Sequence, residues 1–123
     1  TNQSGIERGY YTEEDFQTVT EWMLDQFKQH NIQILDVFFC PHAPESNCSC
    51  RKPKPGMFNQ ANDKYDIDMK NSWMIGDKEA DIQAANAAGI SNTVLVKSGH
   101  KIDEKNSKAR FILDSIKQVV TAL

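Results

Sequence analysis

The spacing of apolar residues predicts alternating helices and strands along the chain. Between residues 13 and about 30, apolar side chains recur at helical spacing, and Thr12 stands where a helix N-cap is expected. Residues 32–39 end in the apolar run Val37-Phe38-Phe39, which is typical of a strand covered on both faces of a parallel sheet. A helix followed by a buried strand is the repeating unit of an α/β domain.

The rest of the chain repeats this unit. The predicted elements are a helix over 55–65, a strand over 72–77, an Ala-rich helix over 79–88, a strand over 93–96, a short strand over 110–113 and a last helix through residue 120. Pro55 suits the first turn of its helix, and Gly89 suits the C-terminal end of the Ala-rich helix. We therefore expect a Rossmann-like α/β fold, with a parallel sheet and flanking helices.

Length and composition fit one small domain, residues 1–123. The formal net charge of −3 leaves no basic surplus that would favour nucleic acid. No apolar run approaches the roughly 20 residues that span a bilayer, and no basic, apolar and small-residue order marks a signal peptide. We expect a cytoplasmic protein with neither a nucleic-acid partner nor a membrane partner.

All three cysteines lie within residues 40–50, together with one histidine. The spacing Cys-x-His-x5-Cys-x-Cys, over Cys40, His42, Cys48 and Cys50, offers three thiolates and one imidazole, which is a closed tetrahedral set for structural zinc. An odd number of clustered cysteines does not make a secreted disulfide framework, so metal ligation in a reducing cytoplasm is favoured over incidental thiols. Zinc would supply the folding energy of a loop, residues 40–52, that has few apolar side chains.

Gly76-Asp77 ends the predicted strand over 72–77 and precedes the Ala-rich helix. The carboxyl ends of parallel strands are where α/β folds bind ligands, and a carboxylate there suits Mg²⁺, which prefers hard oxygen ligands. Lys78 would then contact a phosphate or another anionic group. The alternative is that Asp77 only caps the following helix.

Polar residues at two further places suit phosphate binding. Arg51 and Lys52 follow the last cysteine directly, and a guanidinium with an ammonium group suits phosphate recognition, although a solvated basic patch is the alternative. The turn Thr1-Asn2-Gln3-Ser4 carries hydroxyl and amide donors for phosphate oxygens, although an ordinary polar turn has the same composition.

Two other candidates are interpreted as structural. Asp66-Ile67-Asp68 has the spacing of a nucleophile pair but follows a polar helix end, so we interpret it as a connecting loop. His30 and His100 have no ligand-like neighbours in the sequence, and we interpret them as surface residues.

Several motifs together resemble one family. They are Thr1-Asn2-Gln3-Ser4-Gly5-Ile6, Arg8-Gly9-Tyr10-Tyr11, Cys40-Pro41-His42, Cys48-Ser49-Cys50-Arg51-Lys52-Pro53 and Gly76-Asp77-Lys78-Glu79-Ala80-Asp81. This set resembles the D-glycero-D-manno-heptose 1,7-bisphosphate 7-phosphatases of the haloacid dehalogenase superfamily, whose subgroup includes histidinol-phosphate phosphatases. The resemblance implies a Mg-dependent sugar-bisphosphate phosphatase that serves lipopolysaccharide core heptose biosynthesis.

The resemblance also implies a role for each matched residue. In the family an Asp nucleophile forms an aspartyl-phosphate, and Mg²⁺ bridges nucleophile and phosphate. Thr1 would hold the transferring phosphoryl group, Arg51 would recognise the substrate, and Lys52 would neutralise charge on nucleophile and phosphoryl group. Asp77 would bind Mg²⁺, and Lys78 would contact the substrate, a small phosphorylated sugar. Three further residues would line the substrate: Asn2, Gln3 and Ser4.

The family's Asp-x-Asp nucleophile motif would lie before Thr1. We therefore expect residues 1–123 to be an N-terminally truncated phosphatase domain that is inactive alone. The superfamily sheet resembles the order 5-4-1-2-3, in which residues 32–39, 72–77 and 93–96 would be the third, fourth and fifth strands. Unpaired strand edges would favour domain swapping or self-association. The alternatives are a histidinol-phosphate phosphatase and a non-catalytic zinc-stabilised module.

Overall fold

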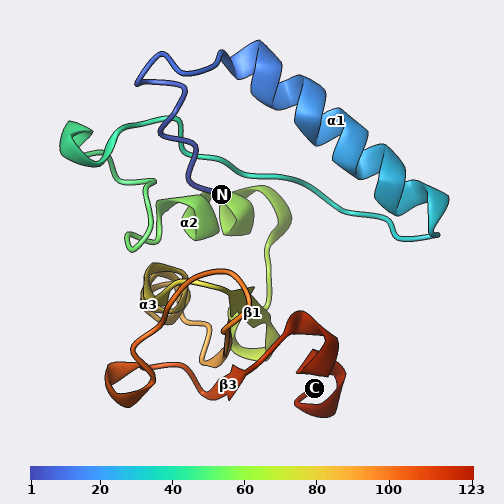
Figure 1. Cartoon of the computed structure of the whole chain (residues 1–123), viewed down its shortest axis with the longest axis vertical. Helices are drawn as coiled ribbons and strands as arrows, with labels where there is room; N and C mark the ends of the chain where they lie inside the picture. The colour runs from blue at the N-terminus through green and yellow to red at the C-terminus, as the bar shows by residue number, and fades with distance from the viewer. The chain divides into compact units, whose positions relative to one another are not determined.

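The computed structural model describes residues 1–123, and the chain divides into two compact units, Thr1–Cys48 and Ser49–Leu123 (Figure 1). The first unit holds one α-helix, and the second holds the sheet. In neither unit is a helix long and apolar enough to cross a membrane.

The first unit is built on helix α1, Glu13–Gln29. Thr12 and Asp15 form a capping box, because each side chain accepts a hydrogen bond from the other residue's backbone N–H. The helix is followed by Asn31, whose φ of 60° lies in the left-handed region that Asn tolerates and that turns the chain back. Figure 1 shows the chain then running back alongside α1, where the rings of Phe16 and Phe39 pack with centroids 4.7 Å apart.

The prediction of a strand over residues 32–39 is wrong. This segment forms no ladder, and the pairing near its end is a single parallel bridge between Asn2 and Cys40. Three backbone hydrogen bonds hold that bridge: Thr1 N to Phe38 O, Cys40 N to Thr1 O and Gln3 N to Cys40 O. A strand needs a partner backbone along its length, and within the described chain no neighbour supplies one for residues 32–37. The short 3₁₀ helix η1, Pro44–Ser46, follows this segment.

The second unit is a three-stranded parallel sheet in the order β1-β2-β3, formed by Trp73–Gly76, Asn92–Val96 and Phe111–Leu113. The predicted fourth and fifth strands and the short last strand are therefore present. They pair with one another, and the predicted third strand is absent from the sheet.

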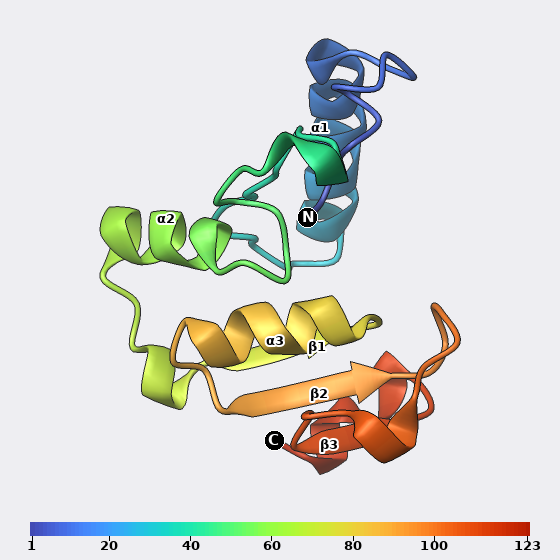
Figure 2. The ribbon, with the colours of Figure 1, turned by 90° about the vertical axis from the view of Figure 1, so that its left-hand side faces the viewer.

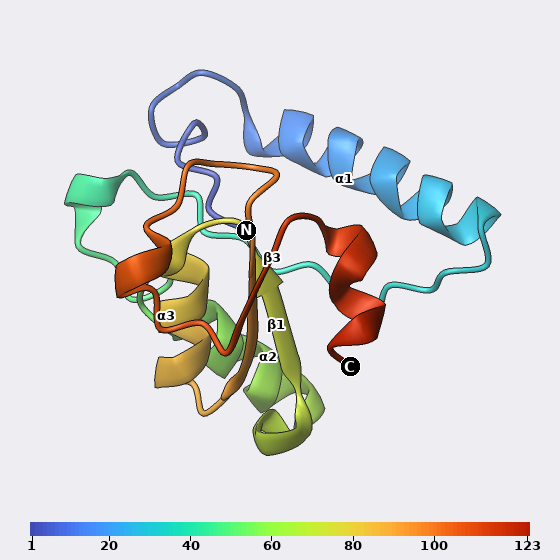
Figure 3. The same cartoon turned by 60° about the horizontal axis from the view of Figure 1, so that its bottom comes forward.

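The second unit also holds five helical segments. They are α2, Gly56–Tyr65; η2, Met69–Asn71; α3, Glu79–Ala87; η3, Glu104–Asn106; and η4, Ile116–Thr121. Figure 2 shows α3 running beside β1 and β2, and Figure 3 shows η4, in red, following β3 at the end of the chain. The predicted last helix is present, capped by Ser115, but it is a 3₁₀ helix and not an α-helix.

The core of the second unit lies between β2 and its neighbours. Ile82 of α3 and Val94 and Leu95 of β2 are fully buried, as expected for a central parallel strand. Val119 of η4 packs against Val94 and Val96 from the last helix. This packing fixes the carboxyl ends of β1 and β2 side by side, with Gly76 level with Leu95.

Candidate active site

Gly76 ends β1 and has to be glycine because the side chain of Asp81 packs over it. A Cβ on residue 76 would lie 2.4 Å from Cβ and 2.5 Å from Oδ2 of Asp81, which is closer than non-bonded atoms approach. The two residues are brought together by the tight turn from β1 into α3, in which Asp81 occupies the first turn of the helix. The Gly-Asp motif at the strand end is therefore a packing requirement as well as a chemical signal.

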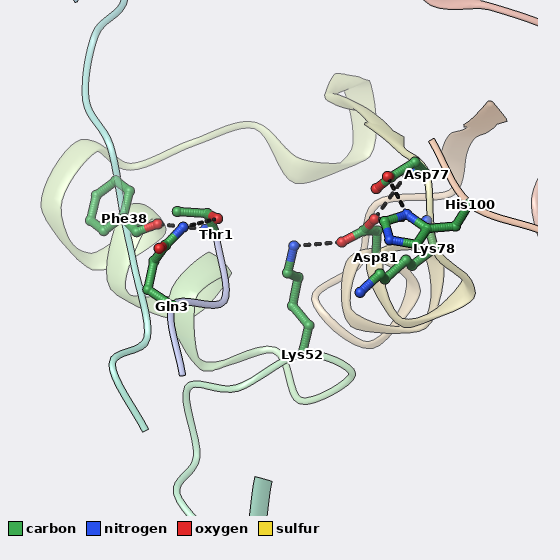
Figure 4. A network of polar contacts seen from close by, with 8 residues as sticks. All are labelled: Thr1, Gln3, Phe38, Lys52, Asp77, Lys78, Asp81 and His100. Carbon is green, nitrogen blue, oxygen red and sulfur yellow. Dashed lines mark hydrogen bonds and ion pairs between the residues drawn. The ribbon is translucent and has the colours of Figure 1, made fainter. Parts of the chain in front are cut away.

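Asp81 holds the loop that carries Asp77 and Lys78. Its Oδ2 accepts hydrogen bonds from the backbone N–H groups of both residues, at 3.1 Å each. Its Oδ1 forms an ion pair with Nζ of Lys52 at 2.5 Å, and the two side chains are only 15% and 8% exposed (Figure 4). The carboxylate of Asp81 therefore connects two predicted parts of the site: Lys52, predicted to bind phosphate, and the loop of Asp77, predicted to bind metal.

The carboxylate of Asp77 is held by His100. The distance from Nδ1 of His100 to Oδ2 of Asp77 is 2.6 Å, with the two side chains 53% and 40% exposed (Figure 4). His100 is indeed a surface residue, but the sequence interpretation missed its contact with Asp77. The strand order could have predicted this contact. Because β1 and β2 are parallel neighbours, the loop after β2 begins at the same sheet edge as Asp77.

A cavity of about 470 Å³ opens beside this cluster. Its walls come from the start of α3 and from the loop after β2, and they include Asp77, Lys78, Glu79, His100 and Lys101. The Glu79 carboxylate accepts hydrogen bonds from Ser107 Oγ and from the backbone N–H of Lys108, which ties the far end of the loop to α3.

The start of the same loop is held by ion pairs of Lys97. Its Nζ lies 2.8 Å from Glu104 and 3.6 Å from Asp114. The hydrogen bond to Glu104 raises the pKa of Lys97, with the charges of Glu104 and Asp114 acting in the same direction. Lys97 is therefore protonated at neutral pH.

Arg51 carries an unpartnered donor. Nη1 of its guanidinium is buried and has no hydrogen-bond partner within the described chain. Buried donors are nearly always paired, so this nitrogen fits an acceptor from a bound anion such as a phosphate oxygen. The residues after it form a tight turn, in which the backbone N–H of Lys54 donates to Arg51 O at 2.9 Å.

The predicted residues of the N-terminal turn lie in the first unit. Nε2 of Gln3 donates to Oγ1 of Thr1 at 3.0 Å (Figure 4). The hydroxyl of Tyr11 donates to Oε1 of Gln3 at 2.5 Å. The Tyr11 ring covers Gly5, where a Cβ would lie 2.2 Å from the ring. Asn2 takes part in the bridge to Cys40, and the carbonyl of Ser4 accepts from Arg8. The hydroxyl of Thr1 is thus fixed through two further side chains.

The four predicted zinc ligands are gathered by the loop that runs from Cys40 to Cys50. Their ligand atoms all lie within 4.8 Å of one another, with Cys40 Sγ 3.5 Å from Nδ1 of His42 and 3.6 Å from Sγ of Cys48. Cys40 and Cys50 are buried. No disulfide joins the three cysteines. Three thiols and an imidazole around one point are the donor set of a closed zinc site, so the residues fit that metal.

Gly56 allows close packing at the exit of this loop. A Cβ on residue 56 would lie 2.2 Å from the carbonyl oxygen of Ser49 and 2.7 Å from Cα of Cys50. The backbone N–H of Gly56 also donates to Ser49 O at 3.1 Å. The first turn of α2 therefore braces the segment that carries Cys50, Arg51 and Lys52.

Comparison with known proteins identifies the family. The HAD-hydrolase-like family model matches residues 49–119. The chain is 45% identical over 127 residues to a D-glycero-beta-D-manno-heptose-1,7-bisphosphate 7-phosphatase of Vibrio cholerae, covering 97% of this chain and 68% of that protein. The chain belongs to the heptose-1,7-bisphosphate 7-phosphatase family.

Other members of this family agree. A D-glycero-alpha-D-manno-heptose-1,7-bisphosphate 7-phosphatase of Photorhabdus laumondii is 47% identical over 116 residues, which are 89% of this chain and 63% of that protein. The chain thus spans somewhat less than two thirds of that relative. The crystal structure of the D,D-heptose 1,7-bisphosphate phosphatase of B. bronchiseptica, complexed with magnesium and phosphate, superposes with a TM-score of 0.80 at 27% identity, over 100% of this chain and 73% of the other.

A second solved structure shows the same fold. It is a HAD-like protein from Mesorhizobium loti, with a TM-score of 0.80 and 29% identity over 98% of this chain and 60% of that one. The haloacid dehalogenase-like fold expected from the sequence is therefore confirmed for the family member described here.

The residues at the end of β1 fit a magnesium ion such as the one bound in the B. bronchiseptica structure. Asp77 offers carboxylate oxygens, the ligand type that Mg²⁺ prefers, and it is only partly buried, which leaves room for the waters that Mg²⁺ keeps. Because Oδ2 is engaged by His100, Oδ1 is the oxygen that remains for a cation.

The one Asp-x-Asp of the described chain does not have the setting of a phosphatase nucleophile. Asp66 is the C-cap of α2 with a φ of 51°, and Asp68 caps η2 through Asn71. Both oxygens of Asp68 accept hydrogen bonds from Asn71, from its backbone N–H and from its side-chain amide. This pair precedes β1 instead of following a strand, in agreement with its interpretation as a connecting loop.

Proposed function

We propose that this chain provides the metal-binding and phosphate-binding part of an enzyme that removes the 7-phosphate from D-glycero-D-manno-heptose 1,7-bisphosphate. The observation that carries the proposal is the Asp81 network. In it a largely buried lysine side chain, that of Lys52, and the metal-binding candidate Asp77 are tied to one carboxylate at the carboxyl end of β1. The relatives from Photorhabdus laumondii and Vibrio cholerae are named as 7-phosphatases of that heptose bisphosphate.

Each residue has a definite role in the proposal. Asp77 would hold Mg²⁺, which when bound neutralises the negative charge of a phosphate. The Lys52 ammonium, fixed by Asp81, would stabilise charge on the phosphoryl group, and Lys78 would contact the substrate. The buried, unpartnered Nη1 of Arg51 would donate to an oxygen of the substrate, and this supports recognition of a second anionic group.

The N-terminal turn would bind the substrate through its hydroxyl and amide groups. Thr1 would hold the transferring phosphoryl group, because its hydroxyl is oriented by Gln3, and Gln3 is oriented by Tyr11. Asn2, Gln3 and Ser4 would line the substrate. Positioning of this kind is what phosphoryl transfer requires, since its catalysis is mostly orientation and charge stabilisation.

Zinc would act as a structural ion in this enzyme. The four ligands, Cys40, His42, Cys48 and Cys50, would leave zinc no open coordination position for a substrate. Zinc would therefore stabilise the loop and the position of the two basic residues that follow it. The loop's few buried side chains support this role, because metal binding can replace the missing apolar burial.

We also propose that residues 1–123 lack the nucleophile. The single Asp-x-Asp they contain has a structural setting, so these residues alone would bind phosphate without hydrolysing it. A cytoplasmic location fits the reduced thiols of the zinc set.

A substrate panel on the protein made from its complete reading frame tests the proposal. We expect phosphate release from heptose 1,7-bisphosphate to exceed release from histidinol phosphate, and no release from either by residues 1–123. Asp77→Ala and Lys52→Ala should each lower the rate by about 10²-fold or more, because each removes a charge aimed at the phosphoryl group. Lys105→Ala, an exposed lysine of η3, is the control. Preferential turnover of histidinol phosphate would reject the substrate, and turnover by residues 1–123 would reject the missing nucleophile.

A further inference from the structure

We infer that His100 is a positioning residue for Asp77: its Nδ1–H holds Oδ2 of the carboxylate, which directs Oδ1 toward a divalent cation. The inference rests on the proposed function, because it takes Asp77 as the metal-binding residue. It adds a residue that acts on the metal through the hydrogen bond to its ligand, without contacting the metal or the substrate.

The turn Ser98-Gly99-His100 is fitted closely to the Asp77 carboxylate. A Cβ on Gly99 would lie 2.1 Å from Oδ2 and 2.7 Å from Cβ of Asp77, so a glycine is required at the point of contact. The imidazole of the next residue then reaches the same Oδ2 at 2.6 Å (Figure 4). Two consecutive residues of one loop are therefore adapted to one carboxylate.

Hydrogen bonds hold both the main chain and the side chain of Asp77. Its backbone N–H donates to Asp81, which fixes the main chain, and His100 donates to the side chain, which fixes the carboxylate. A carboxylate accepts hydrogen bonds and donates none, so the shared hydrogen sits on Nδ1 of His100. This arrangement leaves Oδ1 without a contact to the histidine.

The loop that carries His100 is anchored at both ends. Lys97 pairs with Glu104 at its start, and Ser107 and Lys108 donate to Glu79 at its end. We expect an imidazole on such a loop to keep its orientation when the carboxylate binds a cation. This is the property that distinguishes a positioning residue from a mobile surface side chain.

The expected effect is on metal affinity more than on stability. An exposed pair of this kind contributes little to the stability of a fold. Partners that hydrogen-bond to a metal ligand, in contrast, typically change metal affinity by about 10–100-fold when they are removed. The two roles can therefore be separated by measuring both quantities on the same variants.

The test is a Mn²⁺ titration of the protein made from its complete reading frame, followed by the relaxation of water protons. His100→Ala should weaken Mn²⁺ binding about 10–100-fold with an unchanged melting temperature. His100→Asn should restore most of the affinity, because its amide N–H can replace Nδ1–H. His30→Ala removes the exposed histidine at the end of α1 and should leave the affinity unchanged.

Asp77→Ala separates the inference from the proposed function. If this variant loses Mn²⁺ while His100→Ala binds as tightly as the unmodified chain, the positioning role is rejected and the metal site stands. If Asp77→Ala binds as tightly as the unmodified chain, or the unmodified chain takes up no Mn²⁺ at millimolar concentration, the proposed metal site itself is rejected.

A measurement without metal gives an independent answer. Nitrogen NMR of the His100 ring should show the proton on Nδ1, because the partner of each ring nitrogen decides which one is protonated. Asp77→Ala should shift the proton to Nε2, the nitrogen usually protonated in a solvated neutral histidine. A ring protonated on Nε2 alone in the unmodified chain would reject the hydrogen bond on which the inference depends.

Discussion

Replacing Asp81 with alanine removes a carboxylate that serves three donors, and it is the most informative single change in the second unit. The residue is 5% exposed in the first turn of α3, where alanine is the best helix former, so a loss of stability reports lost contacts and not lost helix propensity. The contacts are the Lys52 ammonium at 2.5 Å and two backbone N–H groups at 3.1 Å.

The magnitude follows from these contacts. Removing one partner of a buried ion pair costs about 3–5 kcal/mol, because the other charge is left buried and unpaired. A hydrogen bond to a charged group adds about 1.5–3 kcal/mol, but the N–H groups of Asp77 and Lys78 lie on a partly exposed loop that water can reach. These terms overlap, so we expect Asp81→Ala to lower the free energy of unfolding by about 4 kcal/mol.

Replacing the other partner of the ion pair, Lys52, should have a smaller effect on the free energy of unfolding. Lys52→Met keeps most of the buried stem and removes the ammonium, but Asp81 retains its two backbone donors. The carboxylate is therefore still hydrogen-bonded, and we expect a loss of about 2 kcal/mol, less than for Asp81→Ala. Lys105→Met, on the exposed face of η3, is the control and should stay within about 0.5 kcal/mol of the unmodified chain.

Urea unfolding, followed by circular dichroism and by tryptophan fluorescence, measures these losses. A double-mutant cycle of Lys52→Met with Asp81→Asn isolates the ion pair, because asparagine has the shape of Asp81 without its charge. We expect a coupling free energy above about 0.5 kcal/mol. A coupling near zero, together with a loss below about 1 kcal/mol for Asp81→Ala, would refute the Asp81 network as the structural basis of the site.

Three further predictions concern the zinc loop, the capping box and the sheet edge. Cys50→Ser should lose most of the bound zinc and lower the melting temperature, whereas Ser49→Ala, between the ligands, should keep both; a Cys50→Ser protein with full zinc content and an unchanged melting temperature contradicts the zinc site. The hydrogen bond from the backbone N–H of Thr12, with that from its hydroxyl, holds the pKa of Asp15 below its usual value. Its stabilisation is therefore present above the ordinary pKa and lost as the pH falls through the lowered one, and thermal unfolding against pH should show that Asp15→Asn removes this acid-dependent loss. The outer edge of β1 is unpaired within its sheet, so light scattering should show self-association that grows with concentration, and a monomer at every concentration would count against it.

The sequence predicts the helices well because their signals are local. Thr12 and Asp15 lie next to the helix that they cap, and Gly89, at a φ of 93°, ends the Ala-rich helix within two residues of its last turn. Such signals need no knowledge of distant residues, since a cap acts on N–H or carbonyl groups of its own turn. The three strands of the sheet were also found, because each is a short apolar run between turns.

Residues 32–39 show where local reasoning fails. Their apolar run has the composition of a buried strand, yet the structure leaves them without a ladder. Strand formation depends on a second backbone that may lie anywhere in the chain, and composition does not report whether one is available. Phe39 instead buries its ring against Phe16 of α1, so the apolar pattern is satisfied by packing without strand pairing.

The candidate site also contains residues that the sequence predicts and one that it does not. Asp77 was predictable because an apolar strand that ends in Gly-Asp marks a ligand-binding edge, and the zinc ligands were predictable from their spacing. His100 was not, because its distance from Asp77 along the chain is bridged by the β1–β2 pairing, which is known only once the strand order is known. A search along each loop that follows a neighbouring parallel strand would have found it.

The spacing from Gly76 to Asp81 explains why one short motif does several things at once. Because α3 starts directly after the strand, Asp81 lies one helical turn beyond Asp77 and folds back over Gly76, where the absence of a side chain lets its carboxylate reach the loop N–H groups. The same carboxylate faces Lys52, which is far away in sequence and follows the zinc ligands. A side chain at residue 76 would therefore displace Asp81 and release both the metal-binding loop and the lysine together. Gly76 is therefore required because only a residue without a side chain leaves Asp81 free to hold both the loop of Asp77 and the ammonium of Lys52.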